Sequence, residues 1–354
     1  MDRVRPRGVD ARSRYSLPFG AVDIPHPARF LVTGALGCIG AWTVKTLVEA
    51  GLPVVIFDRA GDPRRLHLIM ESSDMARVTM VAGDITDLAA IERALDEHEI
   101  TNVIHLAALQ VPFAKADPPA GAMVNVVGTV NVFEAVKRRR ERIGRVVYAG
   151  SIGMFDAADA DLADGRLHED ASAHPRTHYG VYKLANEGNA RVYWQDDALS
   201  SVALRPMTVY GPGRDQGLTS GPTRAILAAL IGRPFEIGFG GRMLFQYAPD
   251  VARAFIAASR TQRPGALVYN LGGSLASIDE FIGAIDRAVP GAADLVTHAP
   301  DPLPFPEEVE TTSIGELGDI PVTPLEQAVA ETVARFRARL QDGSLPPEEH
   351  GLTA

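Results

Sequence analysis

The sequence is poor in cysteine and lysine, and it has no long apolar run. Cys38 is the only cysteine among the 354 residues, which excludes an intramolecular disulfide and fits a protein of the reducing cytoplasm. No apolar stretch approaches the roughly 20 residues that span a bilayer, so we expect no membrane partner. The nine histidines are scattered, without a metal-ligand spacing beside carboxylates or thiols, and we predict no metal site.

The charge balance is acidic. The formal net charge is -9 and the isoelectric point is near 5.5, which argues against nucleic acid or an anionic membrane as the main partner. The hydrophobic share of 46% and the charged share of 22% are typical of a soluble globular protein. The length suffices for one large domain or two ordinary ones with a sizeable core.

Both ends of the chain differ from its middle. Residues 1–20 contain five arginines against two aspartates, with neither apolar periodicity nor the apolar core of a secretory signal. We predict that residues 1–28 form a flexible extension, with a targeting segment as the alternative. Residues 346–354 are predicted to be an exposed tail.

Strand and helix patterns alternate from Arg29 onward. Short apolar runs predict strands at 29–34, 53–58, 77–84, 102–108, 145–151 and 201–206. Helical patterns fall between them at 39–51, 87–98, 119–141 and 179–197. Because the strand runs are continuously apolar, they indicate strands covered by helices on both faces. We therefore predict an α/β protein in which residues 29–206 form a Rossmann-type, doubly wound parallel sheet.

The composition changes after Pro206, where glycine and proline become frequent. Further helices are predicted near 222–232 and 250–260, and Ser277 with Glu280 forms a capping box that begins another. We predict that residues 207–345 form mainly a smaller, substrate-binding lobe, with some segments returning to the first domain. Such a lobe would lie over the carboxyl ends of the strands, where open α/β sheets bind ligands.

The stretch "LVTGALGCIG" places Gly34, Gly37 and Gly40 between the first strand and the first helix. Backbone N–H groups and the helix dipole can meet a pyrophosphate there. The next strand ends in Asp58, 18 residues beyond Gly40, where a carboxylate can bind the ribose 2′-OH and repel a 2′-phosphate. This favours NAD over NADP, although Arg59 could reach a 2′-phosphate instead.

The stretch "YGVYK" places Tyr179 and Lys183 one turn apart on the same face of a predicted helix. An ammonium beside a phenol stabilises the phenolate, as a general acid/base requires. Ser151, at the end of the fifth strand, would emerge at the same sheet edge and could hydrogen-bond a substrate oxygen. The alternatives are an accidental pair on a solvated helix and an ordinary turn serine.

Several motifs occur together between about residues 30 and 275: "TGALGCIG", "GDITD", "HLAA", "AGSIGMF", "YGVYK", "LRPMTVYGPG" and "YNLGG". In this combination and order the chain resembles the extended short-chain dehydrogenases/reductases, the NAD-dependent epimerase/dehydratase family. The resemblance implies an enzyme that uses NAD and forms a homodimer through the helices at 119–141 and 179–197. It also implies sugar metabolism and a small, sugar-like substrate.

The resemblance assigns roles to matched positions. Tyr179 would exchange a proton with a substrate hydroxyl, Ser151 would hold that oxygen, and Lys183 would also bond the nicotinamide ribose. The cofactor would contact Gly34, Leu36, Gly37, Cys38, Ile39, Gly40, Asp58, Arg59, Asp84, Ile85, Ala107, Ala108, Asn125, Tyr179 and Lys183. The candidate substrate contacts are Gln110, Ser151, Ile152, His178, Thr208, Arg214 and Gln246.

Departures from the family pattern narrow the reaction. Ile152 and Gly153 stand where the sugar-nucleotide dehydratases carry an Asp-Glu pair, so dehydration and decarboxylation of the family's kinds are not expected. Oxidation or reduction at a secondary hydroxyl or keto carbon remains, or epimerisation through a transient ketone. Thr208 and Met243 stand where nucleotide-sugar enzymes often have asparagine and arginine. A sugar nucleotide therefore remains open beside a smaller free sugar, sugar acid or hydroxy acid, and a non-catalytic NAD-sensing protein is a further alternative.

Overall fold

The computed structural model describes residues 15–17, 20–22, 28–157 and 166–350. Within the predicted N-terminal extension, β1 (Tyr15–Leu17) and β2 (Gly20–Val22) form an antiparallel pair. The other residues from 1 to 27, and residues 351–354 of the predicted tail, lie outside the described residues.

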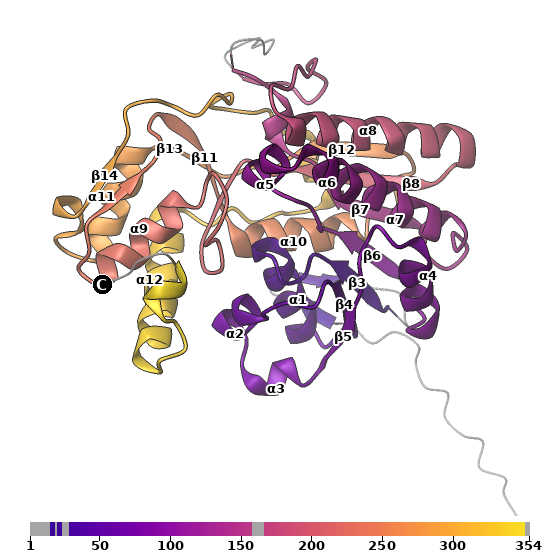
Figure 1. Ribbon diagram of the computed structural model, residues 1–354, viewed down its shortest axis with the longest axis horizontal. Coiled ribbons are helices and arrows are strands. Elements are labelled where there is room, and N and C mark those ends of the chain that lie inside the picture. Colours follow the sequence, from indigo (N-terminus) through magenta and orange to yellow (C-terminus); the bar gives the residue numbers. More distant parts are fainter. Residues whose placement is uncertain (1–14, 18–19, 23–27, 158–165, 351–354) are drawn as a thin grey trace, which may run out of the picture.

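A seven-stranded parallel sheet forms the centre of the molecule (Figure 1). Its order is β12-β8-β7-β6-β3-β4-β5, so the order reverses at β3, and a crevice at that switch point is where such sheets bind ligands. This confirms the predicted fold class. The strands are β3 (Phe30–Thr33), β4 (Val54–Asp58), β5 (Val78–Ala82), β6 (Asn102–His105), β7 (Arg145–Ala149), β8 (Ser200–Arg205) and β12 (Ala266–Asn270).

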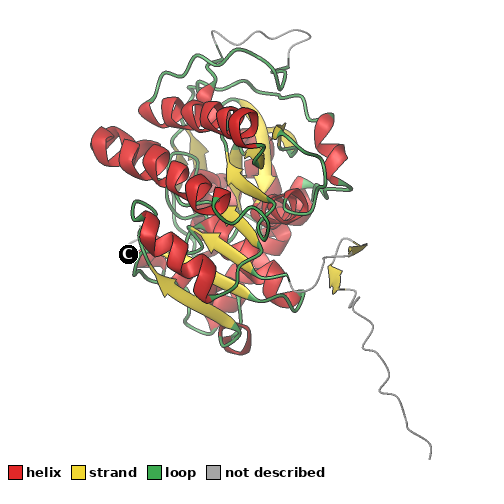
Figure 2. Ribbon diagram, turned by 90° about the vertical axis from the view of Figure 1, so that its right-hand side faces the viewer, coloured by secondary structure: helices red, strands yellow, loops and turns green. Residues whose placement is uncertain are grey.

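Helices cover both faces of this sheet (Figure 2). One face packs against α1 (Cys38–Glu49) and α10 (Ala248–Ala258), and the other packs against α4 (Leu88–Glu97), α7 (Gly128–Lys137) and α8 (His178–Asp197). Along β3, Phe30 and Val32 belong to the first core while Leu31 belongs to the second, which explains why the strand is apolar at every position. The edge strand β5 departs from that pattern, and Met80 on it is 50% exposed.

The helix predicted at 119–141 is shorter and less regular than expected. The chain forms α5 (Val111–Ala116) and α6 (Pro118–Ala122), then a π-helical turn at Met123–Val127, and α7 ends at Lys137. Among the described residues, the run Pro118–Lys137 is long and apolar enough to cross a membrane by length and composition alone, with a mean hydropathy of 1.2. Within it, Val132, Phe133 and Val136 are fully buried in the core between the sheet and α4, α7 and α8.

The second half of the chain builds a smaller lobe and also contributes to the central sheet. Strand β12 pairs with β8 along its whole length, and α10 packs against α1, so the sequence boundary at residue 206 is not a spatial one. The predicted capping box at Ser277 is present, with both hydrogen bonds to Glu280 formed. The lobe contains β9 (Thr208–Tyr210), α9 (Gly221–Leu230), β10 (Phe235–Ile237), β11 (Arg242–Tyr247), β13 (Ser274–Ser277), α11 (Ile278–Ala288), β14 (Val296–His298) and α12 (Leu325–Gln341).

Six shorter helices complete the described fold. They are α2 (Arg64–Ile69) and α3 (Ser72–Met75) after β4, and the 3-10 turns at Ile152–Met154, Ala292–Asp294, Ser313–Leu317 and Pro347–His350. Of these, α2 and the turn at Ile152–Met154 lie next to the cleft described below.

Candidate active site

A cleft of about 500 Å³ lies at the carboxyl edge of the sheet, between the two halves of the chain. Nearly all of the predicted cofactor-binding residues line it. These are Gly34, Leu36, Gly37, Cys38, Ile39, Gly40, Asp58, Arg59, Asp84, Ile85, Ala107, Ala108, Tyr179 and Lys183. Residues that are far apart in sequence therefore meet at one place, as the motif order predicts.

The glycine loop between β3 and α1 leaves no room for side chains. Gly34 has a φ of +66°, and a Cβ there would lie 2.5 Å from the backbone N of Ala107. A Cβ on Gly40 would lie 2.3 Å from the carbonyl oxygen of Gly34. No side chain caps the start of α1, so its first backbone N–H groups can bind a ligand, as a pyrophosphate needs. On this observation the loop fits a dinucleotide.

Asp58 ends β4 beside this loop. Its carboxylate accepts hydrogen bonds from the backbone N–H of Leu36 at 2.9 Å and of Arg59 at 2.8 Å. Burial raises the pKa of Asp58, and the two backbone donors act in the opposite direction. The glycine loop and the Asp58 carboxylate are thus held side by side, as binding of a pyrophosphate and the adjacent ribose requires.

Ser151, Tyr179 and Lys183 come together at the end of β7. The Nζ of Lys183 donates to the carbonyl oxygen of Ala149 at 2.7 Å and lies 5.5 Å from the centre of the Tyr179 ring. A Cβ built on Gly153 would lie 3.2 Å from the Oγ of Ser151 and 3.7 Å from the Cε1 of Tyr179. The small residue at 153 therefore leaves both side chains facing the same space, and Lys183 is buried behind them.

Asn125 does not line the cleft but supports it from the π-helical turn. Its side chain accepts from the backbone N–H of Leu109 at 2.7 Å and donates to the carbonyl oxygen of the same residue at 2.9 Å. Leu109 belongs to the segment after β6 that lines the cleft. The side chain therefore fixes the backbone of that segment.

The sequence did not predict the structural role of His105, which links β3 to α7. Its ring is buried and joins Thr33 of β3, at 2.7 Å, to Thr129 of α7, at 3.0 Å. The hydroxyl of Thr129 in turn donates to the carbonyl oxygen of Asn125 at 2.8 Å. Burial is the main cause that lowers the pKa of His105 to about 3, so the ring is neutral. The only signal in the sequence was a histidine at the end of a predicted strand.

The candidate substrate residues divide into two groups. Gln110, Ile152 and Arg214 line the cleft, as does Ser151. The structure does not bring His178 there, since it is exposed at the start of α8 and stacks on Tyr182 at 6.2 Å.

Thr208 and Gln246 are also away from the cleft, because both serve the packing of the lobe. Thr208 is fully buried, and its hydroxyl lies 3.4 Å from the sulfur of Met243. The side chain of Gln246 accepts from the backbone N–H of Met207 and donates to the carbonyl oxygen of Leu271, both at 2.7 Å. We therefore leave His178, Thr208 and Gln246 out of the proposed site.

Further residues line the cleft that the motifs did not indicate. Arg65, from α2, and Phe305, from the C-terminal segment, lie in sequences without a recognisable pattern. The remaining additions outside the motifs are Leu109, Val111, Phe113, Val124, Gln216, Leu218 and Thr219. Three of these follow the "YGPG" stretch, so proximity to that motif was a signal that could have found them.

Comparisons with known proteins agree with this geometry. A model described as the NAD dependent epimerase/dehydratase family matches residues 30–272. UDP-glucose 4-epimerase from Mycolicibacterium smegmatis is 32% identical over 324 residues, which cover 88% of this chain and 100% of that protein. Among solved structures, UDP-glucose 4-epimerase from Thermus thermophilus in complex with NAD is 26% identical with a TM-score of 0.72, covering 87% of this chain and 99% of that one. A partial consensus L-threonine 3-dehydrogenase is 21% identical with a TM-score of 0.75, covering 88% and 99%, and shares the fold.

Together, fold, site and relatives define an NAD-dependent enzyme of the extended short-chain dehydrogenase type. The chain belongs to the NAD-dependent epimerase/dehydratase family. The predicted resemblance and the predicted cofactor are thereby confirmed.

Proposed function

We propose that the protein moves a hydride between NAD and a secondary hydroxyl or keto carbon of a sugar-like substrate. The observation that carries this proposal is the meeting of Ser151, Tyr179 and Lys183 in the same cleft as the glycine loop. A protein that only sensed NAD would need the glycine loop but not these three side chains, so their presence favours an enzyme.

Tyr179 is the general acid/base in this mechanism. As a phenolate it takes the proton of the substrate alcohol during oxidation, and as a phenol it returns that proton during reduction. The ammonium of Lys183 stands 5.5 Å from the ring and stabilises negative charge on the phenol oxygen when the proton has left. Because Lys183 is held by the carbonyl oxygen of Ala149, this charge is already in position before the substrate binds.

Ser151 orients the substrate oxygen. Its Oγ accepts the backbone N–H of Gly153 at 3.0 Å, which fixes the side chain and leaves its own proton free to donate. A hydroxyl so placed can bond the substrate as an alcohol or as a carbonyl. The cleft wall at Ile152 and Gly153 offers no second proton donor, which supports redox or epimerisation chemistry over removal of water.

The residues that would hold NAD are the glycine loop, for the pyrophosphate, and Asp58, for the ribose of the adenosine half. When bound, NAD supplies the acceptor and donor of the hydride. Asp84, Ile85, Ala107 and Ala108 line the same cleft.

The named relatives support a sugar nucleotide as the substrate, since UDP-glucose 4-epimerase from M. smegmatis matches over its full length. In an epimerase the ketone formed by oxidation is reduced again from its other face. The second candidate is a dehydrogenase of a smaller hydroxy compound. It is favoured by the buried contact between Thr208 and Met243, neutral residues where nucleotide-sugar enzymes often have asparagine and arginine.

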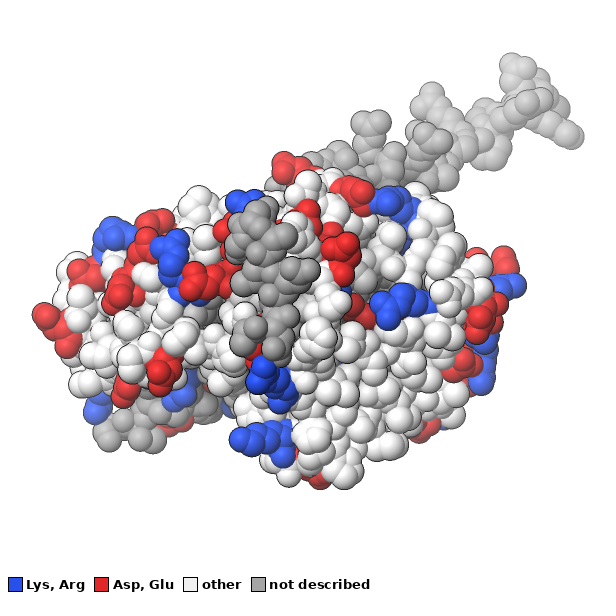
Figure 3. Space-filling view, turned by 90° about the horizontal axis from the view of Figure 1, so that it is seen from above, with Lys and Arg blue, Asp and Glu red and all other residues white. Residues whose placement is uncertain are grey.

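We further propose a homodimer formed through α7 and α8. Exposed apolar side chains gather along these helices and the turn before them: Met123, Val127, Val181 and Val192. Figure 3, which views the molecule from above, shows a broad area without charged side chains at its lower right. A cytoplasmic location remains a prediction from the single cysteine.

The test combines a substrate panel with one variant. Sugars, sugar acids and nucleotide sugars are incubated with NAD or NADP, and the absorbance of the reduced cofactor and the product epimers are measured. A dehydrogenase releases NADH with its product, whereas an epimerase gives a new epimer without net NADH. Tyr179→Phe should lower kcat by about 10³-fold while NAD binding stays nearly unchanged. Full activity of this variant would contradict the proposed function.

A further inference from the structure

Arg214 is a cation in the cleft with neutral partners. Its guanidinium lies 3.4 Å from the Oε1 of Gln110 and 2.9 Å from the Oγ1 of Thr219. Its Nε is buried and has no hydrogen-bond partner, and no carboxylate among the described residues lies within ion-pair distance of it. Burial lowers the pKa of Arg214, so the site is an unfavourable place for an uncompensated charge.

The neighbouring carboxylate does not compensate this charge, because it is already occupied. One oxygen of Asp215 bonds Arg64 at 2.7 Å, and the other bonds Arg65 at 2.6 Å. Two guanidinium groups, those of Arg64 and Arg65, thus share this carboxylate, and Arg214 is left beside them without an ion pair. This local excess of positive charge stands out in a protein whose formal net charge is -9.

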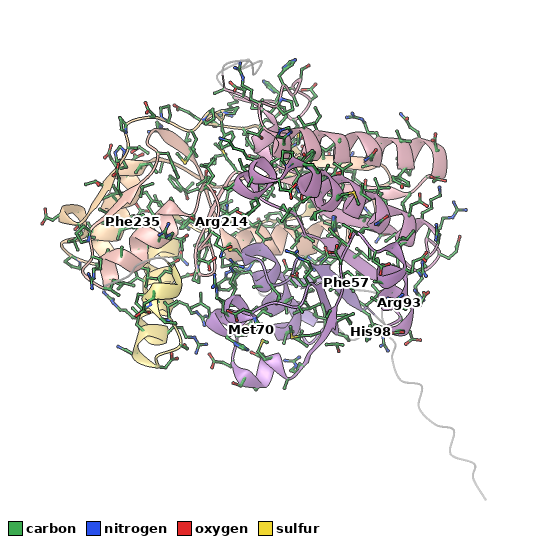
Figure 4. All side chains as sticks on the ribbon, in the orientation of Figure 1. Phe57, Met70, Arg93, His98, Arg214 and Phe235 are labelled. Atoms are coloured by element: carbon green, nitrogen blue, oxygen red, sulfur yellow. The ribbon has the colours of Figure 1, made fainter. Side chains whose placement is uncertain are left out.

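The loop that carries Arg214 is fixed on both sides of that residue. The indole N–H of Trp42 donates to the carbonyl oxygen of Pro212 at 2.8 Å, and Asp215 holds two arginines of α2. Gly217, with a φ of +96°, passes so close to Gln110 that a Cβ would overlap its amide oxygen. Figure 4 shows Arg214 in the region between the lobe and the NAD-binding half. The guanidinium is therefore held in place before any ligand arrives.

We propose that Arg214 binds an oxyanion of the substrate, and that the substrate is an acidic sugar carrying a carboxylate. This inference rests on the proposed function. A guanidinium pairs with a carboxylate through two parallel hydrogen bonds, and the unpartnered Nε together with a terminal nitrogen offers such a pair. The pairing would also neutralise the buried charge that the protein itself leaves open.

A cofactor pyrophosphate is the other source of the same chemistry. Two observations favour the substrate. Arg214 belongs to the lobe, and Gln216, Leu218 and Thr219 of the same loop also line the cleft. Its partner Gln110 follows the segment after β6 that Asn125 fixes, whereas the glycine loop already provides the start of α1 for phosphates.

The experiment is isothermal titration of the NAD-loaded protein with matched pairs of probes. D-glucuronate is compared with D-glucose, and UDP-glucuronate with UDP-glucose, while NAD is titrated separately into the free protein. We expect the wild type to bind at least one acid more tightly than its neutral counterpart. Arg214→Gln should weaken the binding of that acid by about 10- to 100-fold and leave the affinity for the neutral probe unchanged. Arg214→Lys should restore part of the preference, and Arg233→Gln, which removes an exposed charge far from the cleft, should change nothing.

The results distinguish a substrate carboxylate from the cofactor pyrophosphate as the anion that Arg214 binds. Equal binding of acid and neutral probes by the wild type, or binding of neither acid, overturns the inference. A loss of NAD affinity in Arg214→Gln that equals the loss of acid affinity assigns the residue to the pyrophosphate and also overturns it. The proposed function is tested separately, because it fails only if NAD does not bind or if Tyr179→Phe keeps full activity. Melting temperatures of all variants confirm that each is folded.

Discussion

The NAD-binding half and the lobe differ in how their motifs relate to the cleft. In the NAD-binding half the residues singled out by motif nearly all line the cleft, or, like Asn125, hold the backbone that lines it. In the lobe, Thr208 and Gln246 are turned into the packing, and Arg214 is the candidate that reaches the cleft. The difference indicates that cofactor recognition depends on backbone conformations that require particular residues, so the sequence contains a motif for it. Substrate recognition depends on the packing of loops against one another, which has no such motif.

The strongest test of the NAD-binding half is Gly34→Ala. The residue is in the left-handed region, and the new Cβ would overlap the backbone of Leu106 and Ala107, so something must move. We expect a loss of about 3–5 kcal/mol in the free energy of unfolding and a loss of NAD affinity. Urea unfolding and NAD titration measure the two. Gly144→Ala, where no atom lies within 4 Å of the new Cβ, serves as the neutral control, and a tight NAD site in Gly34→Ala would show that the loop is not built as described.

A second test addresses the lobe through Gln246→Leu. The change leaves a buried N–H on Met207 and a buried C=O on Leu271 without partners, and we expect a loss of about 2–3 kcal/mol in stability. Calorimetric melting should show the loss, while the KM of any substrate found changes little. Gln262→Leu, at an exposed position, should stay within about 0.5 kcal/mol of the wild type. Normal stability combined with a raised KM would return Gln246 to the substrate site.

The third test concerns the buried support of the NAD-binding half. The pKa of His105 is about 3 in the folded protein, against the ordinary 6.5 of a histidine in the unfolded chain. Between these values only the unfolded chain takes up the proton, so stability falls as the pH falls below 6.5. From pH 7.5 to 5.5 this amounts to about 1.4 kcal/mol. Urea unfolding at both pH values should show a smaller loss in His105→Gln than in the wild type, whereas the exposed His174→Gln should keep the wild-type dependence.

The smallest expected effect is that of Asp58→Asn on cofactor choice. Replacing the carboxylate removes a charged acceptor for the ribose and reduces the repulsion of a 2′-phosphate. We expect NAD to bind about fivefold more weakly, a change of about 1 kcal/mol, and NADP to bind more tightly. Fluorescence titration with both cofactors measures the ratio, with the exposed Asp62→Asn as control. An unchanged ratio would move the discrimination to Arg59 or Arg65.

The sequence allowed most of the sheet and the catalytic set to be predicted, because each depends on local patterns. Continuous apolar runs marked the strands, and the four-residue spacing of Tyr179 and Lys183 placed both on one helix face. The return of β12 to the sheet could not be located, since its pairing with β8 is a long-range contact without a local signature. The π-helical turn before α7 and the tethering of the 212–217 loop are likewise products of packing.

The substrate candidates that lie away from the cleft illustrate the same physical point. Thr208 and Gln246 are polar and lie near the motifs, yet a polar side chain can equally find its partners inside a lobe. Arg205 shows this most clearly, as its guanidinium makes a bidentate ion pair with Glu187 in the interior. Only the three-dimensional arrangement separates a cation that has its counter-ion from Arg214, which has none among the described residues.

The position of β12 has a consequence for folding. Its five residues pair with β8 from Ala266 to Asn270, and every residue of β8 is buried. The central sheet therefore cannot be completed until the chain has passed through β9, α9, β10, β11 and α10, and a chain cut at residue 206 would expose β8 as an unprotected edge. Melting of the whole protein should accordingly follow one cooperative transition. We therefore expect the NAD-binding half to fold together with the lobe.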